Sequence, residues 1–166
     1  LGATGEERAH FRHFTTREGL VSNRIFSLSQ DANGFIWAAT DMGMERFDGR
    51  NFRHFRLKDY PSMVREDIIF VKCIKDHKVV LSGYNGVLME YDTRTDKFTD
   101  KMPSEFRQSF YKGVEGIYIS PRGDRYACTS GGIYRYDTSS GEYISQFPLF
   151  RKFEHETVRN MLVDGF

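Results

Sequence analysis

The chain has 166 residues, a formal net charge of +1 at pH 7 and 15% aromatic residues, a composition typical of a soluble globular β protein. Acidic and basic residues are interspersed, which argues against nucleic acid as a partner, because phosphate binding needs a concentrated basic face. No stretch approaches the roughly 18 consecutive apolar residues that a membrane-spanning helix needs.

The predicted elements follow an internal repeat. An aromatic-Asp pair occurs as Phe47-Asp48, Tyr91-Asp92 and Tyr136-Asp137, at steps of 44 and 45 residues. Each unit contains four short apolar or aromatic stretches separated by turn residues, which predicts four strands. The predicted strands are 25–30, 35–40, 44–48 and 51–56, then 69–75, 79–82, 87–92 and 97–100, then 114–120, 125–129, 133–137 and 143–147, and a fourth unit opens at 158–164.

A four-stranded antiparallel meander repeated at this spacing predicts an all-β fold, a β-propeller with three complete blades and a partial fourth. Asn33-Gly34 predicts a tight primed-turn hairpin between the first two strands. The alternative is a β-sandwich with strands at similar spacing. The fixed period disfavours the sandwich, since a sandwich has no reason to repeat its turns in register.

Three blades and one strand cannot close a ring, so we expect a segment of a larger propeller. The expected divisions are 1–18 with a lone outer strand at Phe11-Arg12-His13-Phe14, blades at 19–57, 63–100 and 110–147, and the start of a fourth blade at 153–166. Unpaired strand edges favour self-association. The expected partners are therefore further blades of the same chain or a second copy.

Several residues have an expected structural role. Trp37 is expected in inter-blade packing, and Cys73 and Cys128 either form a disulfide between adjacent blades or are two buried free thiols. Five polar side chains are expected to fix turns by accepting hydrogen bonds from local backbone N–H groups. These are Asn23, Asp31, Asp48, Asp92 and Asp137.

The first unit resembles the two-component regulator propeller repeat. The matching residues are Gly19-Leu20, Asn23, Gln30-Asp31, Gly34, Ile36-Trp37, Thr40, Gly43 and Arg46-Phe47-Asp48. The later units retain the glycine and the aromatic-Asp pair. They have Leu81 and Ala127 instead of the tryptophan, and Lys75-Asp76 and Ile119-Ser120 instead of Gln-Asp.

This resemblance implies a periplasmic carbohydrate sensor that acts in signal transduction. Such repeats build the extracytoplasmic part of hybrid two-component systems in glycan-degrading gut bacteria. There, two seven-bladed propellers and an immunoglobulin-like domain precede a membrane helix, a histidine kinase, a receiver and a DNA-binding domain. The signal is an oligosaccharide. On this interpretation, the chain is the beginning of the first propeller after removal of a signal peptide.

If the first strand of each unit is innermost, the loops between blades share a face with the loops between second and third strands, where function usually concentrates. Their carboxylates, amides, guanidinium groups and aromatic rings suit sugar recognition, and the cations also suit uronic or sulfated sugars. The alternative is that these residues are simply solvated. The candidate ligand-binding residues are Arg24, Asp41, Arg65, Asp67, Tyr84, Asn85, Tyr111, Lys112 and Arg159.

The sequence predicts no catalytic residue, no cofactor and no metal site. The histidines are scattered, and His10-x-x-His13 has no third ligand at a suitable spacing. A protein-interaction propeller is the alternative function. A propeller lyase is a weaker one, because it needs a His-Glu constellation and a metal that this segment does not contain.

Overall fold

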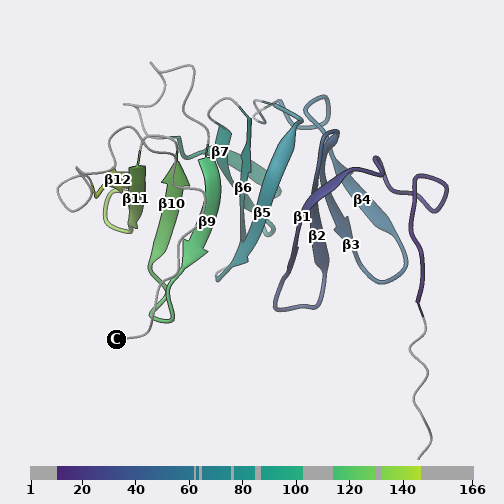
Figure 1. The fold of residues 1–166 in the computed structure, drawn as a ribbon, viewed down its shortest axis with the longest axis horizontal. Coiled ribbons are helices and arrows are strands. Elements are labelled where there is room, and N and C mark those ends of the chain that lie inside the picture. The colour runs from purple at the N-terminus through teal and green to yellow at the C-terminus, as the bar shows by residue number, and fades with distance from the viewer. Residues whose placement is uncertain are drawn as a thin grey trace, which may run out of the picture.

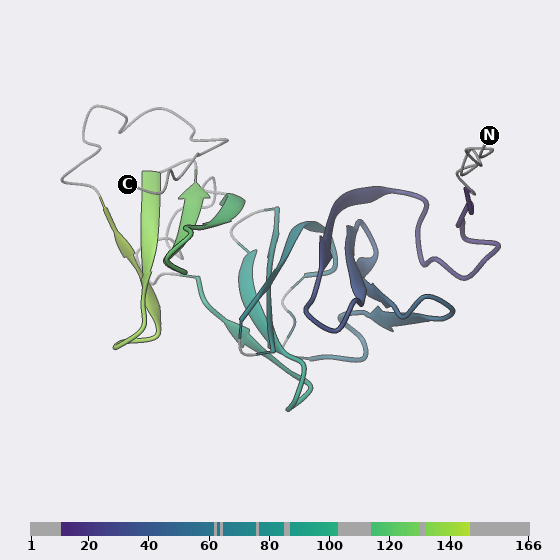
Figure 2. The ribbon, with the colours of Figure 1, turned by 90° about the horizontal axis from the view of Figure 1, so that it is seen from below.

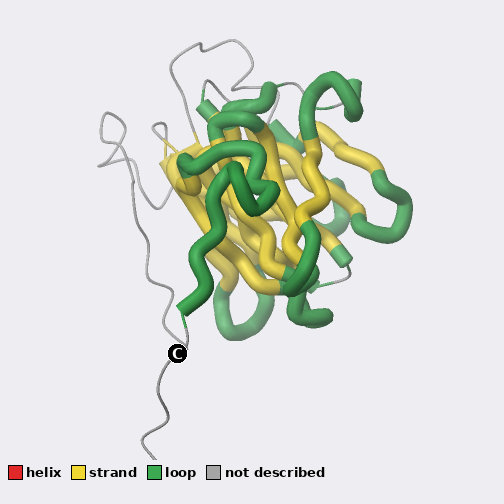
Figure 3. Tube along the Cα trace, turned by 90° about the vertical axis from the view of Figure 1, so that its right-hand side faces the viewer, coloured by secondary structure: helices red, strands yellow, loops and turns green. Residues whose placement is uncertain are grey.

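The computed structural model describes residues 11–61, 63, 65–75, 77–84, 87–102, 114–129 and 132–146. These residues form three four-stranded antiparallel sheets, each with its strands in sequential order. Strands and loops make up all of the described chain, without a helix (Figure 3). The predicted all-β propeller architecture is confirmed for three blades.

The strands lie close to their predicted positions, with ends that differ by at most two residues. Blade 1 contains β1 (Ile25–Gln30), β2 (Ile36–Thr40), β3 (Gly43–Phe47) and β4 (Phe52–Phe55). Blade 2 contains β5 (Ile68–Ile74), β6 (Lys78–Gly83), β7 (Val87–Asp92) and β8 (Lys97–Asp100). Blade 3 contains β9 (Val114–Ile119), β10 (Arg125–Thr129), β11 (Gly132–Asp137) and β12 (Glu142–Ser145). The strand predicted at 158–164 lies outside the described residues.

The blades follow one another in chain order, with blade 2 between blades 1 and 3 (Figures 1 and 2). Strand β1 contacts β5, and β5 contacts β9, so the first strands of the blades are neighbours. Each first strand has a register shift against its partner at the same end, between Ile25 and Ser27, between Ile68 and Phe70, and opposite Cys128–Thr129. A bulge that recurs at one position shows that the three blades are structurally equivalent units.

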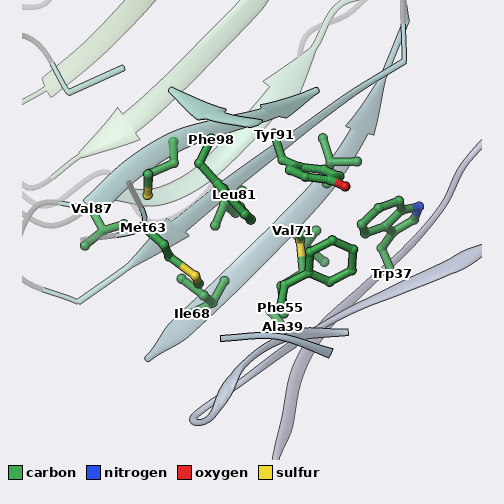
Figure 4. Packing of buried hydrophobic residues seen from close by; sticks show 13 residues of the cluster. Trp37, Ala39, Phe55, Met63, Ile68, Val71, Leu81, Val87, Tyr91 and Phe98 are labelled. Carbon is green, nitrogen blue, oxygen red and sulfur yellow. The ribbon is translucent and has the colours of Figure 1, made fainter. Parts of the chain in front are cut away.

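The interface between blades 1 and 2 is an aromatic core (Figure 4). The ring of Trp37 lies 5.5 Å from that of Phe55 and 5.7 Å from that of Tyr91, measured between centroids. Trp37 and Phe55 are fully buried together with Leu81. Burial of such large rings is worth a few kcal/mol each, about 1.5–3 for a phenylalanine. The expected inter-blade role of Trp37 is confirmed.

The interface between blades 2 and 3 combines an apolar core with a charged edge. Val80 and Leu88 of blade 2 pack with Ile117 of blade 3. Beside this core, Arg125 Nη1 lies 3.1 Å from Glu90 Oε2, and Lys78 Nζ lies 3.0 Å from Glu90 Oε1. Because Glu90 is only 7% exposed, its charge needs these partners.

The aspartates at the turns have the structural role that the sequence predicts. Oδ1 of Asp48 accepts hydrogen bonds from the backbone N–H groups of Arg50 and Asn51. Asp92 and Asp137 make equivalent bonds within the turns that follow β7 and β11. Asn23 differs, since it accepts from Thr16 N–H in the preceding segment.

The hairpin between β1 and β2 differs from the predicted primed turn. Residues 31–35 form the loop, Gly34 N–H donates to the Asp31 carbonyl, and positive φ occurs at Gly34 and not at Asn33. Asp31 Oδ1 accepts from Asn33 N–H at 2.9 Å and from Phe35 N–H at 3.1 Å. These bonds favour a turn in which only Gly34, near its end, adopts a left-handed backbone conformation.

The outer strand expected at residues 11–14 stays a prediction, because it would pair with the last blade of a closed ring. No described strand runs beside these residues, so their backbone groups have no ladder to join. Phe14 instead packs on the edge of blade 1, with ring centroids 4.8 Å from Phe47 and 5.7 Å from Phe52. The segment is therefore held by aromatic contacts.

Candidate functional site

Strand direction divides the connections between two ends of the structure. The connections β2–β3, β4–β5 and β6–β7 lie at the top of Figure 1, here called the upper end. The hairpins β1–β2, β5–β6 and β9–β10 lie at the bottom, here called the lower end. The upper end is the face where the sequence predicts ligand binding, and it carries Arg24, Asp41, Arg65, Asp67 and Tyr84, the described members of the predicted set.

On blade 1, the predicted residues Arg24 and Asp41 form an ion pair. Arg24 Nη1 lies 3.4 Å from Asp41 Oδ2, and the arginine side chain is 71% exposed. The pair forms because Ile25 is paired with Thr40, so that the residues just beyond these strand ends are neighbours. The guanidinium carbon of Arg24 also lies 5.3 Å from the centroid of the exposed Phe26 ring.

On blade 2, Arg65 and Asp67 form a two-pronged ion pair. Arg65 Nε donates to Asp67 Oδ1 at 2.7 Å, and Nη2 donates to Oδ2 at 3.1 Å. These contacts raise the pKa of the Arg65 guanidinium. Tyr84 follows Gly83, where an added Cβ would collide with the Asp67 carbonyl oxygen, so the backbone before Tyr84 lies close to Asp67. Tyr84 itself is 53% exposed.

The remaining predicted site residues are Asn85, Tyr111, Lys112 and Arg159, which lie outside the described residues. The described part of the upper end thus presents two separate ion pairs, one on each of two successive blades. Both of its arginines are already paired with a carboxylate. This pairing weakens the expectation that the upper end recognises an anionic sugar.

The described residues contain no group of three or more His, Cys, Asp and Glu side chains that could hold a metal ion. Cys73 and Cys128 are both free, which decides between the two alternatives left open by the sequence. Burial raises the pKa of each thiol to about 11. At neutral pH both cysteines are therefore protonated and poorly nucleophilic.

The lower end contains a cavity of about 610 Å³ that sequence reasoning did not identify. It lies where the first hairpin of blade 1 meets the end of β5 and the first hairpin of blade 3. Lys75, Arg122, Arg125 and Tyr136 are among its lining residues. The sequence holds a signal, because Gln30, Lys75 and Ile119 share one slot of the repeat and all three line the cavity.

The flank of blade 1 that faces away from blade 2 has an apolar groove of about 250 Å³. Phe14, Leu28 and Phe47 line it, and Leu28 is 64% exposed. Glu45 also lines the groove although it is only 1% exposed. Its Oε1 lies 2.8 Å from His54 Nδ1, whereas Oε2 is buried without a hydrogen-bond partner among the described residues.

Part of the first blade is similar to a known repeat family. Residues 19–42 match the family model for the two component regulator propeller. None of the curated protein sequences compared with the chain matches it significantly. The described part of the structure contains no helix with the length and apolarity needed to cross a membrane.

Solved structures support the same fold. The extracellular domain described as belonging to a hybrid two component system of B. thetaiotaomicron is 21% identical, with a TM-score of 0.75 over 90% of this chain and 22% of its own. An extracellular domain described as part of a one component system of that bacterium is 18% identical, with a TM-score of 0.68 over 91% of this chain and 20% of its own. The β-propeller domain of Cps50 (Swd1) from Myceliophteria thermophila is 17% identical, with a TM-score of 0.55 over 74% of this chain and 41% of its own.

At these identities the likeness establishes the propeller fold. The chain spans about a fifth of the length of the two bacterial domains. The activity of any larger protein is therefore a matter for proposal.

Proposed function

We propose that this propeller segment, whose first blade carries a two-component regulator propeller repeat, is an extracytoplasmic ligand-sensing part of a two-component signalling receptor. In this proposal the receptor lies in the inner membrane and its sensor in the periplasm. An oligosaccharide binds, and the signal passes to a histidine kinase elsewhere in the receptor. The observation that carries the proposal is the family match at residues 19–42, within a blade of propeller geometry.

The chemistry of the upper end supports an oligosaccharide ligand. The Arg65–Asp67 pair holds donors and acceptors in one plane, the arrangement that matches neighbouring hydroxyl groups. Tyr84, which is exposed on the loop after β6 at the same end, offers an aromatic ring for the apolar face of a sugar. Because these residues stand at the ends of paired strands, binding needs little ordering of the protein.

The proposed event is reversible binding without a change to the sugar. Calorimetry of the full chain against a library of neutral oligosaccharides tests it. We expect at least one ligand whose affinity falls about tenfold in Tyr84→Ala and in Arg65→Ala, and is unchanged in Lys97→Ala, an exposed cation on β8. Turnover of a glycan, or loss of affinity only in the control, would overturn the proposal.

A second candidate function, a protein-interaction propeller, is favoured by the apolar flank of blade 1. Positions equivalent to Glu45 are Met89 and Tyr134, and both are buried against the preceding blade. The flank therefore has the geometry of an inter-blade surface, and we propose that another blade covers it. For the chain by itself, a second copy supplies that blade and covers the exposed Leu28.

Sedimentation velocity tests this second candidate. We expect the full chain to associate as its concentration rises, and Leu28→Glu to leave it monomeric. Leu57→Glu is the matched control, because Leu57 is also partly exposed but does not line the groove. A chain that is monomeric at every concentration, or an equal effect of both variants, would contradict the assignment.

A further inference from the structure

The cavity at the lower end is separate from the candidate site at the upper end, because its lining residues belong to other connections. Its volume of about 610 Å³ lies within the range of roughly 300–1,000 Å³ typical of small-ligand sites. Three blades contribute to it, through residues such as Asp31, Lys75 and Arg125. A ligand in this cavity would therefore contact all three blades at once.

Two of the three carboxylates that line the cavity, those of Asp31 and Asp137, are occupied by bonds within their own turns, and the third, Asp124, accepts from Ser120 Oγ at Oδ2. Asp31 Oδ2 accepts from the indole N–H of Trp37 at 2.8 Å, and its Oδ1 accepts from two backbone N–H groups. Both oxygens of Asp137 accept from donors of Ser139 and Ser140. These acids have little acceptor capacity left for a ligand, so their contribution to the cavity is structural.

The cations around the cavity retain donors. Lys75 is exposed and makes no hydrogen bond or ion pair among the described residues. Arg125 gives Nη1 to Glu90, which leaves the other guanidinium donors available. Lys75 and the remaining donors of Arg125 are therefore available to an anionic group.

Arg125 is also held in place before any ligand arrives. Glu90 Oε2 fixes one edge of its guanidinium at 3.1 Å, and the guanidinium carbon lies 4.6 Å from the centroid of the Tyr136 ring. The Arg125 side chain is only 17% exposed. A fixed cation loses little conformational entropy when a ligand binds, which favours affinity.

We propose that this cavity is a second binding site, which takes a ligand of about disaccharide size through a carboxylate or sulfate group. Lys75 and Arg125 bind the anionic group, and the remaining volume accommodates the rest of the ligand. The site is independent of the signalling role proposed above, since it uses other residues at the opposite end. It also puts anion recognition beside Lys75, which makes no ion pair among the described residues, and beside the donors of Arg125 that Glu90 does not use.

Calorimetry with the full chain and a matched pair of disaccharides tests the site. The probes are digalacturonic acid, its neutral counterpart galactobiose, and sodium sulfate as the anion alone. We expect the acid to bind at least tenfold more tightly than galactobiose, and Lys75→Glu to weaken it at least tenfold. Arg125→Gln is expected to act in the same direction, with circular dichroism used to confirm that it folds.

Two control variants separate this site from the proposed function. Tyr84→Ala at the upper end and Lys97→Ala on β8 are expected to leave binding of the acid unchanged. Equal affinity for acid and neutral sugar, no binding of the acid, or insensitivity to Lys75→Glu would overturn the inference. Sulfate that binds as tightly as the disaccharide acid would overturn the assigned ligand size.

Discussion

The side chain of Asp31 connects the first hairpin of blade 1 to the aromatic core between blades. Its Oδ1 accepts from two backbone N–H groups of the hairpin, and its Oδ2 accepts from Trp37 Nε1 at 2.8 Å. Trp37 is fully buried between blades 1 and 2. The substitution Asp31→Ala therefore removes the hairpin bonds and leaves a buried indole donor without an acceptor.

The expected loss of stability follows from these contacts. An unsatisfied buried donor costs about 1–3 kcal/mol, and each lost turn bond about 0.5–1.5 kcal/mol before allowance for exposure. We expect Asp31→Ala to lower the free energy of unfolding by about 2–4 kcal/mol, or Tm by roughly 4–16 °C for a chain of this size. Asp48→Ala is the matched control, because Asp48 makes similar turn bonds but contacts no buried side chain.

Urea unfolding monitored by circular dichroism measures the loss, and fluorescence of Trp37, the single tryptophan, gives a second probe. In a Trp37→Phe background the indole donor is absent, so Asp31→Ala should cost about 1–3 kcal/mol less than in the natural chain. The reasoning is refuted if Asp31→Ala costs no more than Asp48→Ala. An equal cost in both backgrounds would refute it as well.

Three further predictions concern turns and thiols. Gly43→Ala should lower the free energy of unfolding by about 2–5 kcal/mol, because φ is +119° and the new Cβ would collide with the carbonyl oxygen of Phe55 at the end of β4. Gly49 has φ +95° but open space around it, so Gly49→Ala should cost only about 1–2 kcal/mol. Equal losses of stability in urea titrations would contradict the steric argument. A thiol reagent at pH 8 should react slowly with Cys73 and Cys128 in the folded chain and fully after denaturation, since burial raises both pKa values to about 11; rapid native reaction would contradict it. Hydrogen bonds from Ser139, and next in size those from Ser140, lower the pKa of Asp137 from 3.8 to about 2. The contribution of Asp137 to stability is therefore present above pH 4 and is lost as pH falls toward 2. Asp137→Asn should flatten the dependence of the unfolding free energy on pH in this range, and an unchanged dependence would count against these hydrogen bonds.

The blade pattern could be predicted because turn chemistry recurs at a fixed spacing. Asp48, Asp92 and Asp137 each begin the turn between the third and fourth strands of a blade. These recurring turns fix where the strands on either side end and begin. The β1–β2 hairpin was predicted less well. Asn-Gly favours a primed turn, but the side chain of Asp31 bonds two loop N–H groups and selects another geometry. A dipeptide rule does not include that competing bond.

The candidate site could be predicted only in part. Strand alternation was enough to place Arg24, Asp41, Arg65, Asp67 and Tyr84 at one end. It could not show that both arginines are neutralised by neighbouring carboxylates, because that depends on side-chain geometry. The cavity at the lower end was missed since its walls come from four segments far apart in the sequence.

Hydrogen–deuterium exchange of the full chain with a bound neutral oligosaccharide tests the central claim most directly. The account predicts slower exchange around residues 41, 65–67 and 84, unchanged exchange in the lower hairpins, and recovery of the sugar intact. Protection confined to the lower end or to the flank of blade 1, or recovery of a cleaved sugar, would contradict the account.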